Sequence, residues 1–275
     1  RLTLHMLFKE ISSLLRNRLS PEEYIFENEF YGLEYGNKNS NNIIKRVMLS
    51  LDLNLEAIHF ATLNRVNFII SYRGLINEPL KNFNQNLVNK LSLLSKYPLN
   101  IFVLNSSFVA AEGGISDTIL DKIYLTLDKT FDIINKNNVA IPIGRICLPK
   151  KYPNQIQSFT LQDLLKRIKV NLEVDNLCYV GELNTKINRI CLIGAKLPNL
   201  MLLERIISQG CDCLISCDFN YKEAMFAKDI GLTLIKIPHY HCEIKAMKRL
   251  SNTLSLEFPN DEIFLYESKN PLNVY

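Results

Sequence analysis

Short apolar runs of strand length alternate with helical patterns along most of the chain, and this alternation constrains the fold more than any other feature. In the first half, three such runs are separated by two helical patterns. The predicted strands are Val47–Leu53, Asn67–Ser71 and Leu99–Leu104, and the predicted helices are Leu55–Asn64 and Asn86–Lys96. Repeated βαβ units place parallel strands side by side in one sheet. The sequence therefore predicts an α/β fold with mostly parallel sheets and flanking helices.

The second half repeats the same order of elements. The predicted strands are Ile190–Ile193, Cys211–Ser216 and Leu232–Ile237, and the predicted helices are Asn199–Gln209 and Lys222–Ile230. Corresponding strands also read alike, with FIIS in one half and CLIS in the other. We interpret residues 1–275 as a single domain of two similar lobes, about 1–135 and 136–275. A chance likeness of two βαβ units is the alternative, because the pattern is common.

The segments outside these two repeats contain further predicted elements. The N-terminal stretch Arg1–Leu19 fits an amphipathic helix. We expect a long helix at Ser116–Asn135, a short strand at Val139–Ile143, and a helix at Leu161–Asn171 that begins after Thr160. These elements connect the lobes or cover them.

Composition and charge narrow the class of protein. With 47% hydrophobic and 22% charged residues the chain has the composition of a packed globule, and a net charge of +4 without long basic runs does not indicate nucleic-acid binding. Charged and amide residues interrupt every apolar run before the roughly 18 residues that cross a bilayer, so we expect no membrane span. The seven cysteines, an odd number, lie between Cys147 and Cys242, which favours reduced thiols and a cytoplasmic location. A mitochondrial location, with Arg1–Leu19 as a transit helix, is the minority alternative.

The ends of the predicted parallel strands are where functional residues are expected, because open α/β sheets bind ligands beyond the carboxyl ends of their strands. His239 and Glu243 follow the last of these strands and are four residues apart. On a helix they share one face, where both side chains can contact one metal ion. A capped or solvated pair is the alternative, since helices carry such pairs by chance.

Several segments in order resemble the motifs of the GTP cyclohydrolase 1 type 2 homologue family, also called the Nif-three-like family. They are Gly32–Leu33 with the Gly36 turn, Arg46–Leu55 (RVMLSLDLNL), Ala110–Gly114 (AAEGG), Gly144–Ile146 (GRI), Cys217–Tyr221 (CDFNY) and His239–Glu243 (HYHCE). The resemblance covers nearly the whole chain. It implies a two-lobed fold with a centre of two metal ions at the strand ends between the lobes, and a metal-bound water as the nucleophile.

Most of the metal ligands that this resemblance implies are replaced. Tyr72 and Arg73 stand at a histidine pair of the family, Asn105 and Val109 at a histidine and an aspartate, and Lys222 at a further histidine. His239 and Glu243 are the retained ligand positions. Because a bound divalent ion normally needs three or four protein donors, we expect either no metal or at most one weakly bound divalent ion.

The replacements bring permanent cations to the expected site. We hypothesise that the Arg73 guanidinium pairs with Glu243 or Asp218 and so partly replaces the positive charge that the metal ions would supply. Gly113 and Gly114 precede a predicted helix start, which can bind an anion. Together with Arg73 and Lys222 they form a candidate anion site, although a tight turn into the helix is the blander use of the two glycines.

Three functional hypotheses remain. The first is a non-catalytic binding or scaffold member of the family, a pseudoenzyme with an unknown protein partner. The second is a metal-dependent hydrolase of a nucleotide-like substrate that uses His239 and Glu243. The third is an anion-binding module, and the sequence leaves open whether the chain is an enzyme. The resemblance also implies a homo-oligomer, either a dimer or a hexamer.

Overall fold

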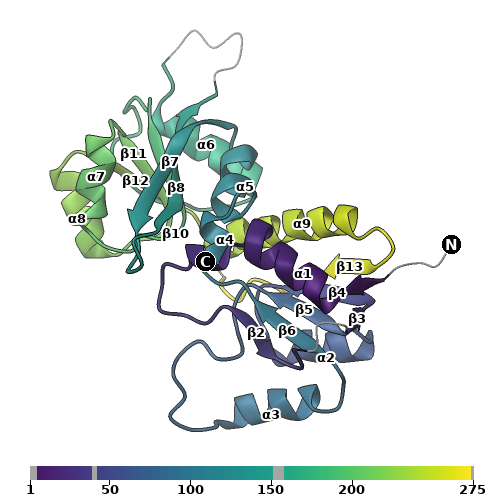
Figure 1. Ribbon diagram of the computed structural model, residues 1–275. Coiled ribbons are helices and arrows are strands. Elements are labelled where there is room, and N and C mark those ends of the chain that lie inside the picture. Colours follow the sequence, from purple (N-terminus) through teal and green to yellow (C-terminus); the bar gives the residue numbers. More distant parts are fainter. Residues whose placement is uncertain (1–4, 39–41, 151–157, 274–275) are drawn as a thin grey trace. The chain divides into compact units, whose positions relative to one another are not determined.

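A computed structural model describes residues 5–38, 42–150 and 158–273 and divides into two compact units (Figure 1). The first unit is formed by Arg1–Glu112 with Met247–Leu272, and the second by Gly113–Ala246 with Asn273–Tyr275. Each unit contains one large β-sheet with helices packed against it, which confirms the predicted α/β class. The segment Met247–Leu272 belongs to the first unit, so the units are not two successive halves of the chain.

The first unit is built on a five-stranded sheet in the order β13-β4-β5-β6-β2. The strands are β2 (Gly32–Tyr35), β4 (Arg46–Ser50), β5 (Phe68–Ser71), β6 (Asn100–Val103) and β13 (Glu262–Leu265). All neighbours are parallel except β2, which pairs antiparallel with β6. The helices α2 (Leu55–Leu63) and α3 (Gln85–Leu94) connect β4 to β5 and β5 to β6, as the alternation of patterns predicts.

The N-terminal segment adds a shorter helix than predicted. The helix α1 (Phe8–Leu14) continues through one π-helical turn at Leu15–Leu19. It is preceded by β1 (Met6–Leu7), which pairs with β3 (Ile43–Ile44), so the first described residues are extended rather than helical. Part of the predicted helix, residues 1–4, lies outside the described residues.

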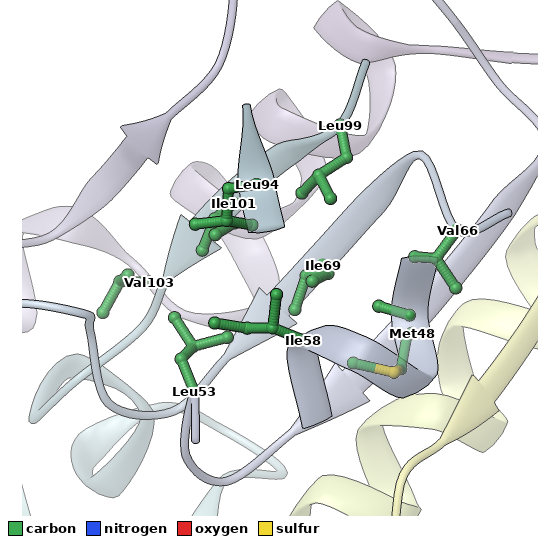
Figure 2. Close-up of a cluster of buried hydrophobic side chains, with 10 residues drawn as sticks. Met48, Leu53, Ile58, Val66, Ile69, Leu94, Leu99, Ile101 and Val103 are labelled. Carbon is green, nitrogen blue, oxygen red and sulfur yellow. The ribbon is translucent and has the colours of Figure 1, made fainter. Parts of the chain in front are cut away.

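The core of the first unit follows the two-residue period of its strands. Met48, Ile69 and Ile101 come from three adjacent strands and pack in one buried cluster against Ile58 of α2 and Leu94 of α3 (Figure 2). Phe68, one residue from Ile69, packs edge-on against Phe8 of α1, with ring centroids 5.9 Å apart. Full burial of one such side chain stabilises the fold by about 1.5–3 kcal/mol. Both faces of the sheet are therefore covered.

The second unit is built on a six-stranded sheet in the order β7-β8-β10-β11-β12-β9. Its strands are β7 (Leu125–Ile134), β8 (Ala140–Pro149), β9 (Cys178–Val180), β10 (Ile190–Lys196), β11 (Cys213–Asp218) and β12 (Thr233–Lys236). The central β10, β11 and β12 are parallel, whereas β7, β8 and β9 are antiparallel to their neighbours. This sheet is therefore mixed.

Helices cover both faces of the second sheet. The helices α7 (Leu202–Ser208) and α8 (Tyr221–Asp229) lie on one face, and α5 (Ile115–Lys122) and α6 (Leu161–Leu172) lie on the other (Figure 1). The α6 helix begins where the sequence predicts, because the side chain of Thr160 accepts a hydrogen bond from the Asp163 N–H in a capping box. The α7 and α8 helices also occupy their predicted segments.

The predicted long helix at Ser116–Asn135 is wrong. The helix α5 ends at Lys122, and the chain then enters β7. Tyr124 has a left-handed backbone with φ of +54°, which a continuing α-helix does not allow. The following LTLDKTFDII segment is rich in β-branched residues and pairs antiparallel with β8, which extends well beyond the predicted short strand. Hydrogen bonding to β8 therefore outweighs the local helical preference of this segment.

Candidate functional site

Three charged residues stand at the carboxyl ends of the parallel strands in the second unit. The strand β10 ends at Lys196, β11 at Asp218 and β12 at Lys236, and Lys196 is the cross-strand partner of Asp218. The Lys236 ammonium group forms an ion pair with Asp218. It also lies 5.8 Å from the centroid of the Phe219 ring. Asp218 is thus flanked by lysines from both neighbouring strands.

The environment of Asp218 favours its ionised form. Partial burial opposes ionisation, but the hydrogen bond and the charge of Lys236, assisted by the charges of Lys196 and His239, outweigh it and lower the pKa of the Asp218 carboxyl. Asp218 is therefore a carboxylate near neutral pH.

His239 and Glu243 lie one turn apart at the start of α9 (His239–Glu257). The Nδ1 atom of His239 is 3.0 Å from Oε1 of Glu243. The Glu243 side chain is 2% exposed, whereas the His239 side chain is 43% exposed. The structure therefore brings together the two predicted ligand residues, with the carboxylate buried and the ring turned partly to solvent.

In the first unit, Tyr72 and Arg73, which the sequence analysis predicts to stand at the histidine pair of the family, follow β5 directly. Tyr72 is buried, and the guanidinium of Arg73 lies 4.9 Å from the centroid of its ring. The Nη1 atom of Arg73 is 3.4 Å from Oδ1 of Asp52, which follows the adjacent strand β4. Asn105 follows β6, and its N–H donates to the Tyr72 carbonyl over 2.8 Å. The ends of three neighbouring strands thus carry this polar group.

A second carboxylate lies at the same edge of the first sheet. Glu29 accepts a hydrogen bond from the Ser106 N–H over 2.5 Å. Burial raises the pKa of the Glu29 carboxyl, while the Ser106 hydrogen bonds and the charge of Arg73 counteract part of that increase. Val109 lies nearby in the sequence, in α4 (Ser107–Ala110), but its side chain is buried in the core.

Gly113, Gly114 and Lys222, which the sequence suggests as an anion site, each have another role or lie on an exposed helix surface. The Gly113 N–H donates to Asp117 Oδ2 over 2.8 Å, so a carboxylate of the protein already uses this donor. Asp117 is held in turn by an ion pair with Arg145, whose side chain is 4% exposed. Gly114 is the N-cap of α5, in line with the turn into a helix. Lys222 is exposed on α8.

The predicted site residues are distributed over the two units. Tyr72, Arg73, Asn105 and Val109 belong to the first unit, and Gly113, Gly114, Lys222, His239 and Glu243 belong to the second. The predicted pairing of Arg73 with Glu243 or Asp218 stays a prediction. Within residues 5–38, 42–150 and 158–273, no group of three or more His, Cys, Asp or Glu side chains is arranged to hold a metal ion.

Several charged residues at the strand ends escaped the sequence prediction. They are Glu29, Asp52, Lys196 and Lys236. Asp52 and Lys236 are the last residue but one of two predicted strands, and Lys196 lies three residues after a third. Because ligands bind beyond strand ends in open α/β sheets, the sequence contained the signal to find them. Glu29 precedes the first predicted strand, and its position depends on a contact with Ser106, 77 residues away.

Within the described residues the seven cysteines form no disulfide, and no group of three or more His, Cys, Asp or Glu side chains is arranged to hold a metal ion. All except Cys178 are buried. Burial raises the pKa of the Cys211 thiol to about 11 and that of Cys213 well above its usual range. Cys211 and Cys213 are small core residues. Cys217 and Cys242 are buried as well.

These features define an α/β protein with polar residues at the strand ends of two sheets. A family model described as Duf34/NIF3 (NGG1p interacting factor 3) matches residues 6–271. The chain belongs to this family, which confirms the resemblance drawn from its motifs.

Two relatives with low sequence identity carry names that match the family resemblance. A "GTP cyclohydrolase 1 type 2 homolog" of Clostridium perfringens is 25% identical over 246 residues, which cover 87% of this chain and 89% of the relative. A "GTP cyclohydrolase 1 type 2" of Helicobacter pylori is 28% identical over 244 residues, which cover 86% of this chain and 87% of the relative.

Solved structures show the same fold. A Staphylococcus aureus hypothetical protein matches with a TM-score of 0.80 at 20% identity, covering 99% of this chain and all of the other. A Bacillus cereus protein related to NIF3 matches with a TM-score of 0.79 at 15% identity and the same coverage. Within the described part of the chain, no helix is long and apolar enough to cross a membrane.

Proposed function

We propose that this chain is a non-catalytic binding or scaffold protein of the Duf34/NIF3 family with a degraded dinuclear metal site. The observation that carries the proposal is the pairing of His239 with Glu243, the retained ligand positions, through a hydrogen bond of 3.0 Å. Where histidines and an aspartate are expected, the chain has a tyrosine, an arginine, an asparagine, a valine and a lysine.

The residues present do not fit a centre of two metal ions. A divalent ion held by protein side chains normally needs three or four donors. When the proton of His239 lies on Nδ1, that atom donates to Glu243, and only Nε2 keeps a lone pair for a metal. A buried carboxylate that orients a histidine is a common partner of a metal ligand, and it equally serves a ring that binds no metal.

Elemental analysis of untagged protein, purified without chelator, tests the degraded site. We expect wild-type protein to contain far less than one transition-metal ion per chain. The gain-of-ligand variant carries Tyr72→His, Arg73→His and Asn105→His, and we expect it to retain more metal than wild type. One or two ions per wild-type chain, lost in His239→Ala, would contradict the proposal.

A metal-dependent hydrolase of a nucleotide-like substrate is the second candidate. The observation in its favour is the partly exposed His239 ring oriented by the buried Glu243, the arrangement of a metal ligand or a general base. The Helicobacter pylori relative is named a GTP cyclohydrolase 1 type 2. Incubation of GTP with wild type and His239→Ala, with added Mn²⁺ or Zn²⁺, tests this candidate. Turnover that disappears in the variant would replace our first proposal.

Family membership also supports assembly from several copies of the chain. We propose a cytoplasmic homo-oligomer, a dimer or a hexamer, which presents its surface to an unidentified protein partner. Size-exclusion chromatography with light scattering measures the molar mass directly. A single species at the 31.7 kDa of one chain would contradict the oligomer.

A further inference from the structure

A pocket of about 700 Å³ lies at the amino ends of β5 and β6 in the first unit. Asn67 directly precedes β5 and Asn100 begins β6, and both residues line the pocket. Arg73 and Asn105 follow the other ends of the same two strands. Small-molecule sites in proteins have volumes of about 300–1,000 Å³. The pocket therefore has room for a small organic ligand, and it is separate from the polar group at the carboxyl ends.

Two asparagine side chains fix the walls of this pocket. The Asn100 amide accepts a hydrogen bond from the Asn37 N–H over 2.9 Å and donates to the Asn37 carbonyl over 3.2 Å. The Asn67 amide accepts from the Arg46 N–H over 3.1 Å and donates to the Ile43 carbonyl over 3.0 Å. Because a primary amide has two N–H groups, each side chain retains a second donor after these contacts between described residues. The walls are thus held in place before a ligand arrives.

The lining combines neutral hydrogen-bonding groups with aromatic rings. Asparagine supplies four of the lining residues, and Tyr35 and Tyr97 add two phenol rings. Tyr97 is 42% exposed, so a planar ligand has access to its ring. Among the described residues that line the pocket, none has a charged side chain. A phosphate or carboxylate group would find no cation to pair with, so the lining favours an uncharged ligand.

We propose that this pocket binds an uncharged nucleobase or nucleoside, with a purine as the preferred base. An asparagine amide presents a donor and an acceptor side by side, which matches the N6 and N7 edge of adenine. Aromatic side chains stack on the faces of bases. A free sugar would engage the amides but offers no planar ring to a tyrosine. The inference is independent of the degraded metal site, because all lining residues lie between Tyr35 and Asn100.

Isothermal titration calorimetry of adenosine into the full chain tests the pocket. We expect one saturable site per chain with a dissociation constant below about 1 mM. Tyr97→Ala should weaken binding at least about tenfold, because a base–aromatic contact is lost. Tyr97→Phe keeps the ring and should weaken binding far less. Tyr179→Ala is the matched control, since Tyr179 is 40% exposed on β9 of the second unit, and it should leave binding unchanged.

Ribose and adenosine monophosphate test the class of ligand. Ribose should not bind at the concentrations that saturate the site with adenosine, and the monophosphate should bind no more tightly than adenosine, since the lining supplies no cation. Ribose binding as tight as that of adenosine would overturn the proposal. A monophosphate that binds about tenfold more tightly than adenosine would overturn it too, because the ligand would then be an anion.

The variants test the location of the site. The proposal fails if wild type shows no saturable adenosine binding, if Tyr97→Ala binds as tightly as wild type, or if Tyr179→Ala loses as much affinity as Tyr97→Ala. Cooperative thermal unfolding checks the fold of each variant, and Tyr97→Leu, which keeps an apolar side chain without a ring, replaces a Tyr97→Ala chain that does not fold. The metal content of wild type is measured separately, so either result there leaves this inference standing.

Discussion

His239 Nδ1 lies 3.0 Å from Glu243 Oε1 across the first turn of α9, and the carboxylate is almost fully buried while the ring is partly exposed. The buried Glu243 carboxylate therefore needs this hydrogen bond more than the exposed His239 ring does. The ring has access to water, but the carboxylate depends on protein donors for much of its hydrogen bonding.

His239→Ala should destabilise the protein by about 1–2 kcal/mol, because the buried Glu243 carboxylate loses a hydrogen-bond donor. His59→Ala is the control, since His59 is an exposed histidine on α2. It should change the free energy of unfolding by less than about 0.5 kcal/mol. Urea denaturation of both variants measures the difference. Equal effects would show that the His239–Glu243 bond adds nothing to stability.

Arg145→Met should destabilise the protein by roughly 3 kcal/mol, because it breaks an ion pair with Asp117 whose arginine is buried. The same arginine donates to the Pro142 carbonyl over 2.7 Å. Arg18→Met, which breaks an exposed ion pair with Glu257, is the matched control and should cost less than about 1 kcal/mol. Chemical denaturation of the two variants gives both values. A loss as small as that of the control would contradict a structural role for Arg145.

Glu29→Gln should increase stability at neutral pH and leave it unchanged in acid. Burial raises the pKa of Glu29 in the folded protein, so the ionised form is disfavoured there relative to the unfolded chain. Wild type therefore loses stability as the pH rises from the ordinary glutamate pKa, about 4.3, through the raised value. The amide oxygen of glutamine still accepts the Ser106 N–H without carrying charge. Thermal unfolding from pH 4 to 8 measures the difference, and a gain confined to acid pH would contradict the assignment.

Cys178 should be the one thiol that reacts rapidly with a chromogenic disulfide reagent in the folded protein. It is exposed on β9, whereas the other six cysteines are buried. Buried thiols react slowly because the reagent cannot reach them and because burial disfavours the thiolate. Cys178→Ser should abolish the rapid phase, and denaturant should expose all thiols. Several rapid equivalents in native wild type would contradict the packing of the second unit.

The repeated βα units were predictable from the sequence, because their cause is local. Apolar runs such as Phe68–Ser71 bury both faces of a strand, and polar residues such as Thr160 start helices through their own side chains. The same locality placed His239 and Glu243 on one helix face. Motifs spread along the chain identified the family for the same reason, since each is a short local pattern.

Only the tertiary structure decided the features that depend on distant partners. The segment Leu125–Ile134 becomes a strand because β8 offers an antiparallel edge. Asp218 pairs with Lys236 because their strands are adjacent, and Glu29 reaches Ser106 across 77 residues. Hydrogen bonds and charges act over a few ångströms in space, whatever the separation in sequence. The sequence by itself therefore determined the repeated βα elements and the family, whereas the strand at Leu125–Ile134 and the partners of the charged side chains were decided by packing.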